Sequence, residues 1–276
     1  MRMTEDLLAI ENMTVMGLPP VDFIRLAAEL ECNYISISIN ERLYNPHGYE
    51  PFSVRDDAGL RRRMVRALRD HGVSISLGDG FVVRPEAEIR DRGGDLDTMA
   101  ELGVSRINTV SMDPDLGRSF DEFGVLAEMA AARGIETTLE FALMLTVPDL
   151  DTSVAAVRHV ARPDFRLLID TMHLVRSGSS AADVAALDPA LIGYAHLSDH
   201  TLEQLGPTYW DDASNRMVPG EGEMPLHDIV AALPADTVIG IEVPMQSRAE
   251  AGESTQDRTR RALHGAREVV ASARGV

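Results

Sequence analysis

The sequence predicts an α/β protein, a (β/α)8 or TIM barrel formed as one domain by residues 1–276. Eight short apolar runs alternate with amphipathic segments along the whole chain. The length of 276 residues suits one barrel of roughly 250 residues. A doubly wound open sheet is the alternative, but the first run is followed by Met-Gly-Leu-Pro-Pro and not by the Gly-x-Gly-x-x-Gly turn typical of that fold. No linker or low-complexity segment divides the chain.

The eight apolar runs are the expected strands. Each is bounded by turn residues or by the end of a helical segment, as strands are. Several are apolar on both faces, which is typical of strands buried in a parallel sheet. The expected strands are 8–15, 34–39, 73–77, 106–111, 135–140, 165–170, 192–197 and 238–243.

Amphipathic segments between these runs predict helices. In one of them, Leu60, Met64 and Leu68 recur every four residues and so lie on one helical face. Glycines stand between helical segments and the next strand, where a left-handed residue ends a helix. The clearest helices are 21–31, 60–70, 123–133 and 262–273, and the glycines are Gly72, Gly103 and Gly134.

Two connections are longer than the others, residues 40–54 and residues 198–225. Long loops in a compact domain are usually functional. Both follow strands, so they project from the carboxyl-terminal face, where barrel enzymes have their active sites.

The charged residues exclude several functions. The chain has 26 Arg and no Lys against 44 acidic residues, a net charge of −18. A lysine Schiff base, a pyridoxal phosphate anchor and a P-loop are therefore excluded. The acidic charge opposes binding to nucleic acid, and the one dense run of arginines, at 61–69, is predicted to be a solvated helix face.

Cysteine usage and hydropathy indicate the environment. The single Cys32 excludes internal disulfides and cysteine zinc clusters, and its apolar neighbours predict a buried residue. No signal peptide and no apolar run of about 20 residues is present. We therefore expect a cytoplasmic protein without a membrane partner.

The ends of the last four expected strands carry metal-ligand side chains, Glu140, Asp170, His196 and Glu242. Residues at the carboxyl ends of barrel strands point into a common volume. Carboxylates grouped in such a place need a counter-charge. Because the chain has no Lys and no arginine is expected to point inward, a divalent metal is the natural choice. Three carboxylates and an imidazole suit Mn²⁺, Mg²⁺, Co²⁺ or Zn²⁺.

Four motifs appear in order over the second half of the chain. They are Asp-x-x-His at 170–173, His-x-x-Asp at 196–199, a Gly-x-Gly turn at 220–222, and Glu-Val-Pro at 242–244. With their strand placement, these motifs resemble the xylose-isomerase-like TIM barrels of the sugar phosphate isomerase/epimerase superfamily.

The resemblance implies one divalent metal ion held by Glu140, Asp170, His196 and Glu242. It further implies that Glu140 and Glu242 are the base and acid that transfer a proton α to a carbonyl of a sugar or related keto-polyol, through an enediolate. We thus expect a metal-dependent isomerase or epimerase with a small-molecule substrate. Barrels of this family often form dimers or tetramers, so the resemblance also implies a homodimer or homotetramer.

Further residues are expected to touch the substrate. His173 is placed to reach a substrate oxygen, and Asp199 to orient His196 or a substrate hydroxyl. Trp210, in the second long connection, is read as a lid aromatic. The other residues expected at the mouth are Asn12, Asn40, His47 and Asp79.

Two features differ from the ketose 3-epimerases of this family. Residues 141–145, Phe-Ala-Leu-Met-Leu, are apolar where those enzymes carry a polar segment with a second glutamate. The arginine that they place six residues after the metal histidine is Leu202 here. The apolar segment would favour a substrate with an apolar part or a dehydrated ring, unless it packs in the core.

Other functions therefore stay open. A lyase, such as a dehydratase of a cyclic keto-polyol or keto-acid, would begin with the same proton abstraction. A barrel that only binds a ligand, or serves as a subunit of a complex, would not need both glutamates. The related trinuclear zinc endonucleases need further histidines, which Gly78-Asp79-Gly80 does not supply, and the net charge opposes DNA.

Overall fold

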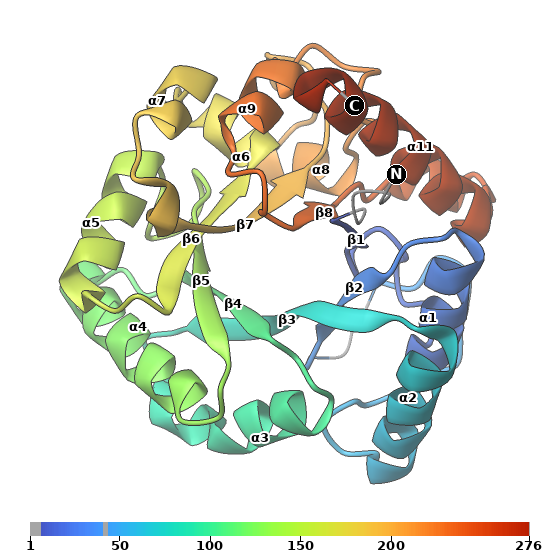
Figure 1. Cartoon of the computed structure of the whole chain (residues 1–276), viewed down its shortest axis with the longest axis horizontal. Coiled ribbons are helices and arrows are strands. Elements are labelled where there is room, and N and C mark those ends of the chain that lie inside the picture. Colours follow the sequence, from blue (N-terminus) through green and yellow to red (C-terminus); the bar gives the residue numbers. More distant parts are fainter. Residues whose placement is uncertain (1–6, 41–43, 276) are drawn as a thin grey trace.

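The computed structural model describes residues 7–40 and 44–275. Eight parallel strands follow one another in sequence order and close into a barrel, with helices around the outside (Figure 1). The barrel predicted from the sequence is therefore confirmed. The strands are β1 (Leu8–Ile10), β2 (Tyr34–Ser38), β3 (Ser74–Val83), β4 (Arg106–Ser111), β5 (Glu136–Glu140), β6 (Phe165–Asp170), β7 (Ile192–Leu197) and β8 (Ile239–Ile241).

All eight strands lie where the apolar runs predict them, and three have the predicted bounds. The largest differences are at β1 and β3. β1 ends at Ile10 because the chain then turns, with the left-handed residues Met16 (φ 46°) and Gly17 (φ 83°) closing the turn. β3 continues past Leu77 because an irregularity between Gly78 and Phe81 shifts its register against β4 without ending the pairing.

The four predicted helices are confirmed as α1, α2, α4 and α11, with shifted ends. α4 begins at Leu116 because the side chain of Asp115 accepts the Arg118 backbone N–H, which caps the helix before its apolar face begins. The described helices are α1 (Pro20–Glu29), α2 (Ala58–His71), α3 (Gly93–Glu101), α4 (Leu116–Ala131), α5 (Leu150–Val160), α6 (Thr171–Arg176), α7 (Ala181–Ala185), α8 (Tyr209–Ser214), α9 (Leu226–Ala232), α10 (Gln246–Glu250) and α11 (Thr255–Arg274), with 3₁₀ turns η1 (Ile89–Arg92) and η2 (Pro189–Leu191). Among them, none is long and apolar enough to cross a membrane.

The predicted glycine turns are also confirmed. Gly72, Gly103 and Gly134 have φ angles of 68°, 73° and 72°, so each reverses the chain in a conformation that L side chains rarely adopt. Each reversal sends the chain from an outer helix back into the barrel wall.

The main core lies between the strands and the surrounding helices, and it includes the buried Cys32. A smaller cluster is formed by Ala9, Leu77, Leu168 and Tyr194, one residue from each of four strands. These side chains fill the barrel, so it is a packed structure and not a pore.

The register of the last strands positions the polar residues above that packed interior. Asp170 pairs with His196 across β6 and β7, and His196 pairs with Gly240 across β7 and β8. Glu140 is the last residue of β5, paired with Leu168. The carboxyl ends of neighbouring strands therefore bring their side chains to one end of the barrel.

Candidate metal centre

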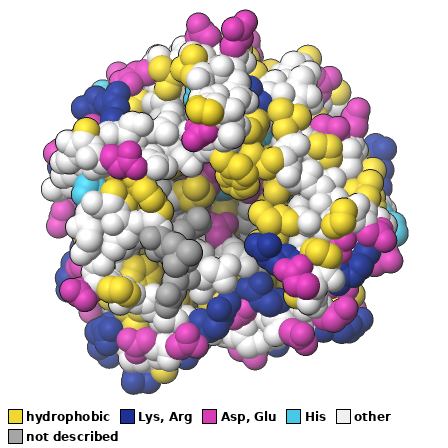
Figure 2. Space-filling view, turned by 180° about the vertical axis from the view of Figure 1, so that it is seen from behind, with side chains coloured by type: hydrophobic (Ala, Val, Ile, Leu, Met, Phe, Trp, Pro, Cys, Tyr) yellow, Lys and Arg dark blue, Asp and Glu magenta, His cyan; other side chains and the backbone are white. Residues whose placement is uncertain are grey.

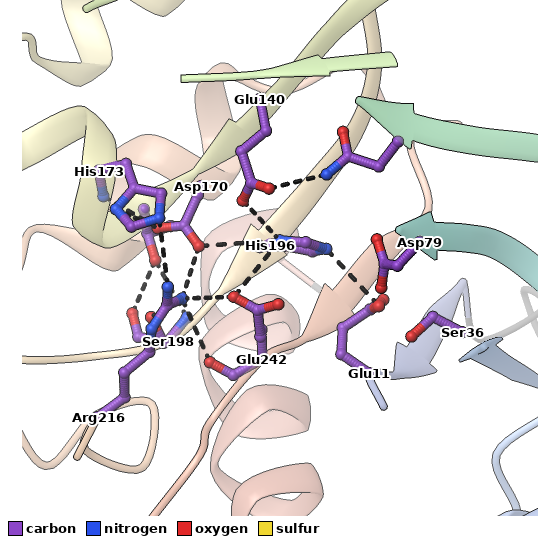
Figure 3. A network of polar contacts seen from close by, with 12 residues as sticks. Glu11, Ser36, Asp79, Glu140, Asp170, His173, His196, Ser198, Arg216 and Glu242 are labelled. Atoms are coloured by element: carbon purple, nitrogen blue, oxygen red, sulfur yellow. Dashed lines mark hydrogen bonds and ion pairs between the residues drawn. The ribbon is translucent and has the colours of Figure 1, made fainter. Parts of the chain in front are cut away.

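Glu140, Asp170, His196 and Glu242 converge at the carboxyl-terminal end of the barrel (Figure 3). Each offers one ligand atom, and the four atoms lie within 4.8 Å of one another. Asp170, His196 and Glu242 are buried, whereas Glu140 is half-buried. The structure thus brings together the four side chains that the strand-end pattern selects.

The imidazole of His196 points its Nδ1 atom at the three carboxylates. Nδ1 lies 3.1 Å from Glu140 Oε1, 3.7 Å from Glu242 Oε2 and 3.8 Å from Asp170 Oδ2. Burial by itself lowers the pKa of His196, but Glu242, Glu11 and Glu140 outweigh it and raise that pKa well above its usual range. Without a metal, the histidine is therefore protonated and contributes positive charge to this cluster.

The two glutamates of the cluster have opposite pKa shifts. Burial raises the pKa of Glu242 to about 7, with Glu140 and Asp170 adding to the rise. Burial acts in the same direction on Glu140, but the charge and hydrogen bond of His196 hold the pKa of Glu140 below its ordinary value. Such a separation is what an acid and a base at one site require.

An arginine does point inward, so the expectation that none would is wrong. The side chain of Arg216 is 2% exposed, and its Nη1 lies 2.6 Å from Asp170 Oδ2 and 3.1 Å from Glu242 Oε2. Burial would raise the pKa of Asp170, but Arg216 holds it well below its usual range. Arg216 therefore supplies part of the counter-charge that we assigned to a metal alone.

Arg216 was missed because it comes from the far end of the connection between β7 and β8. The sequence analysis looked for an arginine six residues after His196. That position is Leu202, which is 53% exposed. The intervening chain forms α8 before Arg216 enters the site. The sequence signal that was available is its place just before the Gly-x-Gly turn that begins at Gly220.

His173 lies beside the cluster, held on three sides. Its backbone N–H donates to Asp170 Oδ1 at 2.9 Å, and its ring Nδ1 lies 2.6 Å from the Tyr209 hydroxyl. Nε2 lies 3.4 Å from Nη2 of Arg216. Burial lowers the pKa of His173 despite the nearby Asp170, so the ring is neutral at neutral pH.

The aromatic residue that reaches this site is Tyr209, which the sequence analysis missed. Its ring stacks on His173 at 5.6 Å between centroids. The neighbouring Trp210, expected as a lid, is 55% exposed. Both belong to α8, a helix too short to predict from hydrophobic periodicity.

Asp199 has a different surrounding from the one expected. Its Oδ2 accepts the backbone N–H groups of Gly220 and Gly222 at 2.9 Å, and Oδ1 accepts that of Met224 at 3.1 Å. A Cβ at Gly222 would lie 2.3 Å from Asp199 Oδ1, so only glycine fits there. Asp199 thus fixes the Gly-x-Gly turn, and its hydrogen bonds do not include His196.

Asn12, Asn40 and Asp79, which were expected at the mouth of the barrel, form hydrogen bonds with one another or with neighbouring residues of β2 and β3. The Asn12 side chain donates to Ser36 Oγ at 2.9 Å and to Asp79. The Asn40 side chain donates to the Gly80 carbonyl at 3.1 Å.

Two side chains remain to be placed. The ring Nε2 of His47 lies 2.9 Å from Nη1 of Arg258 in α11. Asn108, which was not predicted, donates to Glu140 Oε2 at 2.8 Å and so orients that carboxylate.

A cavity of about 240 Å³ borders the cluster, with Glu140 and Glu242 in its wall. The molecule is hollowed on this side, with acidic side chains in the hollow and apolar ones at its rim (Figure 2). Segment 141–145 does not line this cavity: Phe141 and Ala142 are buried, and Leu143 is 48% exposed. The cavity is lined in part by Ser38, Asn40, Asp79, Asn108, Glu140 and Glu242.

The donor set fits a divalent cation. Three carboxylate oxygens and one imidazole nitrogen are ligands for Mn²⁺, Mg²⁺, Co²⁺ and Zn²⁺. Oxygen and nitrogen ligands lie about 2.0–2.2 Å from zinc, so any two ligands of one ion lie within about 4.4 Å of each other. The four atoms of the cluster lie within 4.8 Å of one another, which is close to this limit. Glu140, Asp170, His196 and Glu242 could therefore hold one such ion with small side-chain movements.

A family model described as a xylose isomerase-like TIM barrel matches residues 24–267. The chain belongs to this family. D-psicose 3-epimerase of Agrobacterium fabrum (strain C58) is 27% identical to this chain over 185 residues. That match covers 64% of this chain and 58% of the relative, so it spans little more than half of the epimerase.

Two solved structures have the same fold as this chain. The zinc-bound IolI protein superimposes with a TM-score of 0.82 at 19% identity, covering 96% of this chain and 98% of that one. A D-psicose 3-epimerase crystallised in the presence of D-fructose gives 0.72 at 18% identity, covering 95% and 99% of the two chains.

Proposed function

We propose that this chain is a divalent-metal-dependent isomerase or epimerase that transfers a proton α to a carbonyl of a sugar or related keto-polyol. The observation that carries the proposal is that Glu140 and Glu242 belong to one four-residue donor cluster and have pKa values shifted in opposite directions. A site that moves a proton from and to carbon needs a base and an acid on the same substrate.

Each glutamate has a role in this scheme. Glu140, held ionised by His196, accepts the proton from the carbon next to the carbonyl. In the metal-free protein burial raises the pKa of Glu242 to about 7, so this carboxyl can take up a proton near neutral pH. It is the group that returns a proton to the resulting enediolate. When bound, a divalent metal would polarise the substrate carbonyl and stabilise the negative charge that develops on its oxygen.

The lining of the cavity supports a polyol substrate. Ser38, Asn40, Asp79 and Asn108 bring hydroxyl, amide and carboxylate groups to the wall of the cavity. Such groups exchange hydrogen bonds with sugar hydroxyls. The relative named D-psicose 3-epimerase and the structure obtained with D-fructose support ketohexoses as the first substrates to try.

The test is solvent-exchange NMR on purified protein loaded in turn with Mn²⁺, Mg²⁺, Co²⁺ or Zn²⁺. D-fructose, D-psicose and cyclic keto-polyols are incubated in D₂O, with metal-stripped protein as the control. Deuterium entering the α-carbon together with an epimeric or isomeric product supports the proposal. A product that has lost water would make the chain a lyase, and absence of both metal binding and exchange would leave a ligand-binding barrel.

A further inference from the structure

A fully buried carboxylate lies behind the candidate metal centre. Glu11 follows β1 directly and is 0% exposed. Its Oε1 accepts a hydrogen bond from the Tyr194 hydroxyl at 2.8 Å, and that hydroxyl lies 2.9 Å from Ser76 Oγ. A chain of polar groups from β3, β7 and the end of β1 therefore crosses the barrel interior and fixes one oxygen of Glu11.

The other oxygen of Glu11 faces the back of His196. Glu11 Oε2 and His196 Nε2 lie 3.6 Å apart, on the opposite side of the ring from the three carboxylates (Figure 3). Within the described part of the chain, both atoms are buried and neither has a hydrogen-bond partner. Because buried polar atoms are nearly always paired, each of these two atoms is the natural partner for the other after a small side-chain movement.

The barrel is built to hold this carboxylate. Gly240 of β8 pairs with His196, and a Cβ on Gly240 would lie 1.9 Å from Glu11 Oε1. Glu11 therefore fills the space that a side chain at position 240 would need. The Glu11 backbone N–H also donates to the Ile241 carbonyl at 3.2 Å, so closure of β1 on β8 sets the position of the side chain.

We infer that Glu11 is a positioning residue, which accepts the Nε2–H of His196 and thereby presents the Nδ1 lone pair to a divalent cation. A ligating imidazole must be unprotonated at the ligating nitrogen, and an acceptor at the other nitrogen fixes that tautomer and strengthens the ligand. Nδ1 is the atom that faces Glu140, Asp170 and Glu242. The inference rests on the metal site of the proposed function.

Metal affinity provides the first test, with Zn²⁺ or Mn²⁺ alone as the probe in chelator competition. Glu11→Ala should weaken binding by about 10–100-fold, the usual effect of removing such a partner. Glu11→Gln keeps the shape but loses the charge, so its loss should be smaller and should remain measurable if Glu11→Ala fails to fold. Thr137→Val is the matched control, because the Thr137 hydroxyl is buried in the same barrel and has no hydrogen-bond partner among the described residues.

Thermal unfolding of the metal-free variants separates this role from a structural one. The affinity loss should appear in variants that are still folded, whereas Thr137→Val should bind metal as the wild type does. Wild-type affinity in folded Glu11→Ala and Glu11→Gln would overturn the inference.

The tautomer provides a second, independent readout. ¹⁵N NMR of the His196 ring should find a proton on Nε2 in both metal-free and Zn²⁺-loaded wild type. An unprotonated Nε2 in either form would contradict the role of Glu11. If the wild type bound no cation, the proposed function would fail as a whole. A wild type that binds Zn²⁺ with an unprotonated Nε2 would instead overturn the role of Glu11 alone.

Discussion

Arg216 and Asp170 form a buried ion pair at the candidate metal centre, with Nη1 2.6 Å from Oδ2. The same nitrogen lies 3.1 Å from Glu242 Oε2. The arginine thus contacts two of the carboxylates that could bind a metal, and it comes from the long connection after β7. This links the loop to the charge balance of the site.

Removal of this arginine should destabilise the metal-free protein. Arg216→Met keeps most of the buried volume but leaves two carboxylates without their cation, so we expect a loss of about 3–5 kcal/mol in the free energy of unfolding. Denaturant titration measures it, and saturating metal should reduce the loss by supplying positive charge. Arg25→Met, which breaks an exposed pair with Asp22, should cost under about 1 kcal/mol. Equal losses of stability in Arg216→Met and Arg25→Met would contradict the role of Arg216 as a buried counter-charge.

Glu242→Gln should abolish proton exchange at the substrate and weaken metal binding. The amide can neither carry the proton nor offer the same charged ligand. Exchange NMR and metal titration measure the two effects. Glu268→Gln, at an exposed position of α11, is the control and should behave as the wild type. Full exchange activity in Glu242→Gln would remove the proposed mechanism.

His196→Ala should lower metal affinity without removing a proton-transfer group. Metal analysis after dialysis should find less than one ion for each chain under conditions in which the wild type retains it. A stoichiometry equal to that of the wild type would exclude His196 as a ligand.

Metal binding should weaken as the pH falls through about 7. The pKa of Glu242 is raised from 4.5 to about 7, so below that pH the metal-free protein holds a proton on this carboxyl. A cation must displace that proton, and the apparent affinity should fall by about tenfold per pH unit for each proton released. Calorimetry in buffers of different ionisation enthalpy counts the protons. Glu242→Gln should show a shallower dependence, and a constant affinity from about pH 5.5 to 7.5 would contradict the raised pKa.

Tyr209→Phe should loosen His173. The hydrogen bond at 2.6 Å is lost while the stacked ring remains, so we expect about 1 kcal/mol less stability and a reduced kcat. Trp210→Phe, at the next and exposed position, should change stability by less than Tyr209→Phe does. If Trp210→Phe alone reduced turnover, Trp210 would be the lid that the sequence analysis expected.

The strand-end pattern found the four cluster residues because it is a local signal. Apolar runs at 165–170 and 192–197 end in Asp170 and His196, and parallel pairing places the ends of neighbouring strands side by side. Glu11 carries the same signal, since it follows a strand. It was hidden because the expected first strand continued to residue 15, past the real end at Ile10.

The eight strands, the closed barrel and the four-residue donor cluster were thus determined by the sequence, through hydrophobic periodicity and residue type along short stretches. Only the tertiary structure decided that Arg216 enters the site, that Tyr209 and not Trp210 contacts His173, and that Glu11 lies behind His196. The first two depend on the path of a long connection, and the third on the closure of β1 against β8. Contacts between residues so far apart in the sequence are set by packing in three dimensions. Such packing produces no hydrophobic period and no fixed residue spacing that could be recognised in the sequence.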